Sequence, residues 1–208
     1  MLHGKPGANG VIGHARAYEV LSMVVFAGRR RRTFGRLVAL AGVAPGDRVL
    51  DIGCGPGYLT ALAAAAAAPG GSAVGVDPSE PMVGQARRRR GGPHCTFEVG
   101  RAEALAAPDG TFDVVVSSLA VHHIPEEVRG TAFDEVFRVL RPGGRVLLAD
   151  FRPPRGRLAR HLVGATAGAG MRDNPVERIA PMLTGAGFTA VTESAAGPFL
   201  HCVRAVKP

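Results

Sequence analysis

Short apolar runs alternate with longer segments of helical periodicity through the middle of the chain. The apolar runs predict five strands, at residues 48–52, 73–76, 96–99, 112–117 and 145–149. The intervening patterns predict three helices, at residues 58–68, 79–90 and 126–140. Because strands and helices alternate, and the strands are almost wholly apolar, we expect a parallel sheet with helices on both faces.

The two ends of the chain have different patterns. Residues 16–42 carry apolar positions at helical spacing, and a Gly-, Pro- and Arg-rich stretch follows at 151–175, with a helical pattern at 158–167. A further helix is expected at 175–186. The last apolar runs, at 189–193 and 200–206, are joined by a short connection, so we expect them to pair as an antiparallel hairpin.

Composition and charge limit the classes of function. The chain has 208 residues, enough for one domain, and 46% of them are apolar. Its net charge of +8 comes largely from arginine runs at 29–32 and 87–90, which fit solvated helix faces or a surface for nucleic acid or another anion. Aromatic residues make up only 5% and Trp is absent, so a base-stacking surface for nucleic acid is disfavoured.

The cysteines and the apolar runs bear on location. Cys54, Cys95 and Cys202 are too few and too scattered for a disulfide framework or a metal site, so we expect no metal and a reducing cytoplasm. No stretch has the pattern of a secretory leader, and the apolar runs are shorter than the roughly 20 residues that span a bilayer. Peripheral membrane contact, and a monomer or a homodimer, are left open.

The segment between the first predicted strand and helix reads VLDIGCGPG. Gly53, Gly55 and Gly57 remove side-chain bulk at alternate positions, so a ligand can lie directly against the backbone. The helix that follows presents free N–H groups at its start. In open parallel sheets, ligands bind at the carboxyl ends of the strands, where the strand order reverses. We therefore expect the ligand site at this loop.

Asp77 ends the second predicted strand, where a carboxylate can accept hydrogen bonds from both hydroxyls of a ribose. An acid at this spacing also occurs in dinucleotide-binding folds, but their loops read GxGxxG to fit a pyrophosphate. This loop reads GxGxG and follows Asp51, which would repel a pyrophosphate and would attract the ammonium group of an amino acid. S-adenosylmethionine has such a group and carries no phosphate.

These segments resemble motifs of the class I S-adenosylmethionine-dependent methyltransferases, and the small-molecule branch with the ubiquinone/menaquinone C-methyltransferases is the most similar. The glycine loop resembles motif I, and VGVDPSEPM at 74–82 is similar to the ribose segment. GRAEAL at 100–105 with DGTFD at 109–113, and RVLRPGGR at 138–145, resemble the later motifs in the same order. The resemblance covers roughly residues 35–206. It implies a Rossmann-like doubly wound α/β fold with strand order 3-2-1-4-5-7-6.

The resemblance also implies roles for individual residues. Asp51, Gly53, Cys54 and Gly55 would hold the methionine part of the cofactor, Asp77 the ribose, and Pro78 and Met82 the adenine, with a backbone contact from Ala102 and with Ser118 beside the sulfonium. Arg101 departs from the family, which usually has Asp or Asn there to accept a hydrogen bond from the adenine amino group. Arg cannot accept one. Either the neighbouring backbone accepts it, or adenine is bound more weakly.

The acceptor side carries fewer signals. His122 and His123 follow the fourth strand, and either could act as a general base or simply bond to backbone. Residues 1–32 are interpreted as a helical lid on a domain at 33–208, and 151–175 as an insertion at the acceptor pocket. Candidates to line a pocket for a lipophilic or anionic small molecule are Tyr18, Met23, Phe26, Phe151, His161, Met171 and Arg172.

The sequence therefore predicts methyl transfer from S-adenosylmethionine to a small molecule, driven mainly by proximity and orientation. Two alternatives remain. One is a nicotinamide-dependent oxidoreductase on a related fold. The other is an RNA- or DNA-directed methyltransferase or binder that uses the arginine runs, although residues 117–120 read SSLA, where nucleic-acid amino-methylating relatives carry an Asn/Asp-Pro-Pro-Tyr/Phe signature.

Overall fold

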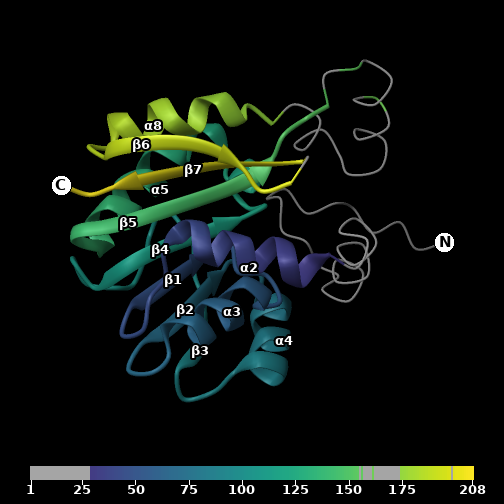
Figure 1. Ribbon diagram of the computed structural model, residues 1–208, viewed down its shortest axis with the longest axis vertical. Helices are drawn as coiled ribbons and strands as arrows, with labels where there is room; N and C mark the ends of the chain where they lie inside the picture. Colours follow the sequence, from purple (N-terminus) through teal and green to yellow (C-terminus); the bar gives the residue numbers. More distant parts are fainter. Residues whose placement is uncertain (1–28, 155, 157–160, 162–173, 198) are drawn as a thin grey trace.

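A computed structural model describes residues 29–154, 156, 161, 174–197 and 199–208. One seven-stranded sheet forms its centre, in the order β3-β2-β1-β4-β5-β7-β6 (Figure 1). Strands β1 to β5 run parallel, whereas β7 pairs antiparallel with both β5 and β6. The strands are β1 (Arg48–Ile52), β2 (Ser72–Asp77), β3 (Cys95–Val99), β4 (Phe112–Ser118), β5 (Leu140–Phe151), β6 (Thr189–Ala195) and β7 (Leu200–Val206). The predicted fold class and strand order are confirmed.

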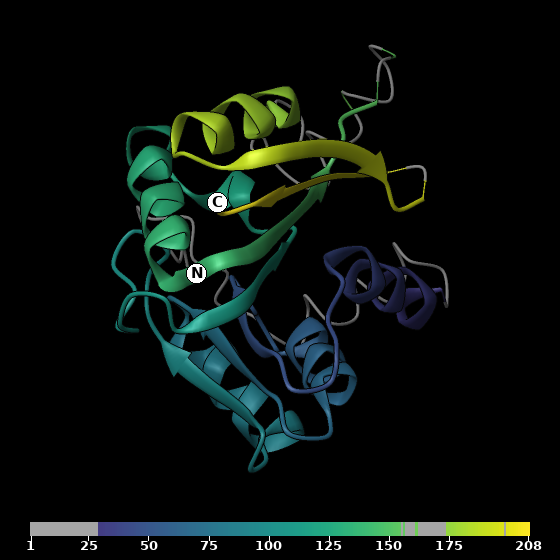
Figure 2. The same cartoon turned by 60° about the vertical axis from the view of Figure 1, so that its left-hand side comes forward.

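Helices cover both faces of the sheet (Figure 2). On one face lie α2 (Arg30–Ala41), α3 (Tyr58–Ala67) and α4 (Glu80–Arg90). On the other lie α5 (Glu126–Val139) and α8 (Ile179–Gly185). Ser79 is the N-cap residue of α4. No helix in the described part of the chain is long and apolar enough to cross a membrane.

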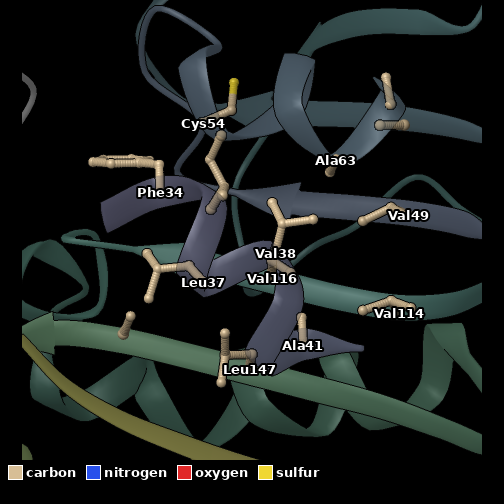
Figure 3. Packing of buried hydrophobic residues seen from close by; sticks show 14 of the residues in the cluster. Phe34, Leu37, Val38, Ala41, Val49, Cys54, Ala63, Val114, Val116 and Leu147 are labelled. Atoms are coloured by element: carbon tan, nitrogen blue, oxygen red, sulfur yellow. The ribbon is translucent and has the colours of Figure 1, made fainter. Parts of the chain in front are cut away.

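Two apolar clusters hold these layers together. Figure 3 shows the first, in which Phe34, Leu37 and Val38 of α2 lie over the sheet residues Val116 and Leu147. The second joins α5 and α8 to the opposite face of the same strands. Burial on this scale, at about 25 cal/mol per Å² of apolar surface, is the main source of stability in such a domain. Both faces are closed, so a ligand has access at the ends of the strands.

Strand β1 lies between β2 and β4, which puts the reversal of strand order at the pair of β1 and β4. The connections from β1 and β4 leave the sheet in opposite directions, and a crevice forms between them at the carboxyl ends. The loop after β1 and the residues after β4 line this crevice, as the next section describes.

Strand β5 is longer than the five residues that we predicted. It extends over Leu140–Phe151 and includes the Pro-Gly-Gly segment at 142–144, which precedes the predicted strand at 145–149. Leu140 pairs with Phe112 and Arg145 with Val114, so the residues between Leu140 and Arg145 bulge out of the ladder. Gly143 has a φ of 72°, a left-handed conformation that glycine adopts without strain. The glycines therefore interrupt the ladder without ending the strand, since pairing continues on both sides of them.

Three further differences concern helices. A 3-10 turn at Val121–His123 was not predicted. The helix expected at 175–186 begins as a 3-10 turn, Val176–Arg178, before α8. Of the helix expected at 16–42, the structure describes α2, which crosses the boundary that we placed between residues 32 and 33. Residues 1–28, and nearly all of the predicted helix at 158–167, lie outside the described residues.

Candidate functional site

The loop between β1 and α3 folds tightly because its three glycines adopt positive φ angles of 69°, 50° and 81° at Gly53, Gly55 and Gly57. A Cβ on Gly53 would lie 2.3 Å from the Cβ of Ala120, and one on Gly57 would lie 2.4 Å from the Phe97 ring. A Cβ on Gly55 would meet nothing within 4 Å. Two of the glycines therefore serve packing, and Gly55 borders open space.

Asp77 connects this loop to the end of β2. Its Oδ2 accepts a hydrogen bond from the Gly55 N–H at 2.8 Å, and its Oδ1 accepts one from the Ser79 N–H at 2.9 Å. Burial raises the pKa of the carboxyl group, while these two backbone bonds lower it. A carboxylate oxygen has more than one acceptor site, so Asp77 can bind further donors from a ligand while it holds the loop.

The larger of two adjoining pockets, called here the main pocket, opens beside Asp77. It brings together eight of the twelve predicted site residues: Gly53, Gly55, Asp77, Pro78, Met82, Arg101, Ala102 and His123. Sequence reasoning missed the others, which contribute apolar surface, backbone or one carboxylate: Ile52, Val76, Ser79, Gly100, Glu103, Leu119, Ala120, Ile124 and Pro125. A signal existed for several of them, since Ile52 and Val76 end predicted strands and Gly100 directly follows one.

A smaller cavity, called here the second pocket, lies on the other side of Gly53, which lines both. It contains the other cofactor candidates, Asp51, Cys54 and Ser118, together with side chains from α2 and α3. Asp51 is buried, and its Oδ2 accepts a hydrogen bond of 2.6 Å from the Thr60 hydroxyl. Burial raises the pKa of Asp51 to about 7, against the lowering effect of the Thr60 bond.

Arg101, the departure from the family pattern, lies at the rim of the main pocket. Its Nε donates to the Glu103 Oε1, and the Arg101 side chain is 51% exposed, against 18% for Glu103. Glu103 also lines the pocket, and its position was not predicted from the sequence. The pocket thus contains a carboxylate acceptor two residues after the position where the family usually carries one. The ion pair with Arg101 restricts the side chain of Glu103.

The two histidines differ in their surroundings. His122 does not line the main pocket; its Nδ1 lies 2.7 Å from the Asp150 Oδ1, and its backbone N–H donates to the Asp150 Oδ2 at 3.0 Å. Asp150, fully buried at the end of β5, therefore fixes the 3-10 turn. His123 lies beside His122 and faces the pocket. Desolvation, and then the neighbouring His122, lower the pKa of His123, so its ring is neutral near pH 7.

Of the predicted acceptor-pocket residues, the structure describes Phe151 and His161. Phe151 stacks against Phe199, with ring centroids 6.3 Å apart, and His161 is exposed. Neither lines the main or the second pocket. Tyr18, Met23, Phe26, Met171 and Arg172 lie outside the described residues.

The residues around the two pockets fit S-adenosylmethionine. Gly55 leaves open space where a ligand can lie against the backbone, with Asp77 at its side. In the second pocket, Ser118 is 9% exposed, and its Oγ has no hydrogen-bond partner among the described residues. A buried hydroxyl without a partner is costly, and a polar ligand group would satisfy it. An adenosine end and a polar amino-acid end therefore each have matching surroundings.

Comparisons with known proteins agree with this geometry. A family model described as a methyltransferase domain matches residues 49–144. The chain is 37% identical over 150 residues to a demethylmenaquinone methyltransferase of Symbiobacterium thermophilum, covering 70% of this chain and 59% of that protein. It is 36% identical over 166 residues to an arsenite methyltransferase of Halobacterium salinarum, covering 76% and 41%. The chain thus spans about three fifths or less of the length of these two relatives.

The fold is shared with solved structures. That of a SAM-dependent methyltransferase from Aquifex aeolicus aligns with a TM-score of 0.70 at 19% identity, covering 86% of this chain and 93% of that one. The matched motifs, the strand order, and the glycine loop with carboxylates at the ends of two neighbouring strands lead to one conclusion: the domain belongs to the class I S-adenosylmethionine-dependent methyltransferases.

Proposed function

We propose that this chain binds S-adenosylmethionine across both pockets and transfers its methyl group to a small molecule. The observation that carries the proposal is the placement of Asp51 and Asp77 at the ends of β1 and β2, on either side of a glycine loop that leaves room for a ligand. This arrangement supports an adenosine group in the main pocket and an amino-acid group in the second.

Each main-pocket residue has a role that follows from its chemistry. Asp77 accepts hydrogen bonds from the ribose hydroxyls, and Pro78 and Met82 contact the adenine ring beside the backbone of Ala102. Glu103 accepts a hydrogen bond from the adenine amino group, and thereby provides the acceptor that Arg101 cannot provide. The Arg101 side chain holds Glu103 in place through their ion pair. Such charge-assisted hydrogen bonds contribute about 1.5–3 kcal/mol each.

The protein's part in the reaction is mainly orientation. The bound cofactor supplies a methyl group on a positively charged sulfur, and the chain must place the acceptor atom in line with it. His122 is held by Asp150 and positions the turn after β4. His123 faces the main pocket with a lowered pKa, so it is a weak base. We therefore assign His123 a positioning role. The acceptor is then one that loses its proton without a strong general base.

An aromatic, quinone-like acceptor fits better than arsenite. The names of two relatives refer to demethylmenaquinone and to arsenite. Arsenic binds through accessible thiolates, but Cys54, Cys95 and Cys202 are all buried here. Burial also raises the pKa of each thiol, which keeps it protonated. We propose that residues 1–32 and 151–175 complete the acceptor pocket, with 1–32 as a lid.

The test has two parts. Calorimetry with S-adenosylhomocysteine on the full chain should give micromolar affinity, on the order of −8 kcal/mol. Methyl-labelled S-adenosylmethionine is then offered with quinone-like phenols, polyketide- and fatty-acid-derived acceptors, arsenite and total RNA. Label on a quinone-like acceptor is the expected result. Absence of binding would contradict the proposal as a whole, and label on RNA or arsenite alone would contradict the acceptor class.

A further inference from the structure

The connection between β3 and β4 forms one wall of the main pocket. Residues 101–110 are called here the wall loop. On this side the pocket is lined by Gly100, Arg101, Ala102 and Glu103. The Ala104 N–H donates to the Arg101 carbonyl at 3.2 Å, which closes the first turn of the loop. The groups that we assign to the adenine therefore lie on a connection between strands, and their placement depends on what holds that connection.

Arg138, in the last turn of α5, binds the second half of the wall loop. Its Nη2 donates to the Leu105 carbonyl at 3.0 Å. Its Nη1 donates to the Ala107 carbonyl at 2.8 Å and to the Asp109 Oδ1 at 2.7 Å. The Arg138 carbonyl in turn accepts a hydrogen bond from the Gly110 N–H at 3.0 Å. One residue of α5 thus contacts the loop at four positions.

Glu135 holds both Arg138 and the wall loop. Its Oε1 accepts from the Arg138 Nε at 2.6 Å and its Oε2 from the Nη2 at 2.8 Å, the paired geometry that suits a guanidinium. The same Oε2 accepts from the Leu105 N–H at 2.9 Å. The bond from Arg138 lowers the pKa of Glu135 against the effect of burial, and the bond from Leu105 lowers it further. Glu135 is therefore ionised near pH 7, and these two side chains are called here the α5 clamp.

The α5 clamp lies outside the ligand site, but the other end of the helix reaches it. Neither Glu135 nor Arg138 lines the main or the second pocket. Pro125, the N-cap residue of α5, does line the main pocket. Leu105 is buried in the apolar cluster that joins α5 to the sheet. One helix therefore connects the wall loop to the turn after β4 that bears His123, and sets the separation of the two.

We propose that Glu135 and Arg138 are positioning residues for the cofactor, which hold the wall loop in the conformation that receives the adenine. The inference rests on the proposed function and makes it more specific, because it assigns adenine binding in part to side chains that do not touch the ligand. A loop without its clamp adopts the binding conformation only part of the time, and the apparent affinity falls by that fraction. The loss of several hydrogen bonds together shifts such an equilibrium by more than about tenfold.

Calorimetry on the full chain tests the proposal. Arg138→Met should weaken S-adenosylhomocysteine at least about tenfold. Arg141→Met is the matched control, since Arg141 forms an ion pair with Asp113 and its side chain is 48% exposed; affinity should stay within about twofold. Arg138→Lys keeps a cation that can donate to a loop oxygen, so it should recover part of the loss. An affinity within about twofold of the unaltered chain in Arg138→Met would overturn the proposal.

Hydrogen exchange separates positioning from a general loss of stability. In ligand-free Arg138→Met, the amides of residues 101–110 should exchange faster, while those of β4 should keep their rates. S-adenosylhomocysteine should restore much of the protection. Glu135→Gln keeps an oxygen that can accept from the Leu105 N–H, so it should speed exchange less than Glu135→Ala does. Faster exchange of β4 and the wall loop to the same extent would show a structural role only, and would overturn the proposal.

The outcomes separate the two proposals. If the unaltered chain does not bind S-adenosylhomocysteine, the proposed function fails and this inference fails with it. If the chain binds it, and Arg138→Met speeds exchange in the wall loop without weakening the ligand, the function stands and the positioning role is wrong. If Arg138→Met does not fold, Arg138→Lys and Glu135→Gln are measured in the same way. Affinities within about twofold of the unaltered chain in both variants would then overturn the proposal.

Discussion

The two pockets on either side of Gly53 are built differently. The polar groups of the main pocket are held by neighbouring backbone: Asp77 accepts from the N–H groups of Gly55 and Ser79. The second pocket is formed by side chains from segments far apart in the sequence, among them Arg30, Asp51 and Ser118. The first can be recognised in a short motif, whereas the second exists only after α2 has packed on the sheet.

The difference has an energetic side. In the main pocket, two backbone hydrogen bonds offset part of the burial of Asp77. In the second pocket, burial raises the pKa of Asp51 to about 7, and the Ser118 hydroxyl has no hydrogen-bond partner among the residues that the structure describes. Such groups lower stability until a ligand satisfies them. We expect the main pocket to supply affinity for the adenosine part. We expect the second pocket to make binding depend on the ionisation of Asp51.

The largest effect is expected at Asp77. Asp77→Ala would remove the two hydrogen bonds that we propose to the ribose, together with the anchor of the glycine loop, so affinity for S-adenosylhomocysteine should fall at least about a hundredfold. Calorimetry measures the loss, and Asp134→Ala, an exposed aspartate on α5, is the matched control. An unchanged affinity would show that adenosine does not bind in the main pocket.

The junction between the pockets can be tested with two glycines of one loop. Gly53→Ala adds a Cβ that collides with Ala120, so the free energy of unfolding should fall by about 2–4 kcal/mol. Gly55→Ala has open space and should cost only the left-handed conformation, about 1–2 kcal/mol, yet it should weaken S-adenosylhomocysteine by filling the ligand's space. Denaturant unfolding and calorimetry give the two quantities. Similar effects on both quantities for the two variants would contradict this division of roles.

Glu103 allows a test of adenine recognition. Glu103→Ala should reduce the preference for S-adenosylhomocysteine over S-inosylhomocysteine, which lacks the amino donor, by about tenfold. Competition binding of the two ligands measures this preference. Glu98→Ala, an exposed glutamate on β3, should leave it unchanged. If Glu103→Ala keeps the full preference, the backbone near Ala102 reads the adenine instead.

The smallest effect is expected in proton linkage at Asp51. The carboxyl of the free protein has a pKa of about 7, so it is largely protonated at pH 6, and a bound ammonium would favour the ionised form and lower the pKa. Binding at about pH 6 should therefore release up to about one proton, and release should decline as pH rises above about 7. Calorimetry in buffers of different ionisation enthalpy measures this. Asp51→Asn should bind without proton release; the same release in that variant would assign the proton to another group.

Much of the fold could be predicted from local patterns. Apolar runs located every strand, because a buried strand of a parallel sheet is apolar along most of its length. The bulge in β5 could not be predicted, since the Pro-Gly-Gly turn at 142–144 looks the same whether or not Leu140 pairs with Phe112. The 3-10 turn at Val121–His123 was missed for a similar reason, because its shape depends on hydrogen bonds to Asp150, 28 residues away.

The sequence by itself determined the parallel sheet, the glycine loop and Asp77, because spacing along one strand, one turn and one helix start fixes how these residues lie. Only the tertiary structure decided which acid accompanies Arg101, which histidine faces the pocket, and that Arg30 lies in one cavity with Asp51 and Ser118. These relations depend on how α2, β4 and β5 pack against one another, and no local pattern encodes a distance between side chains that lie many residues apart.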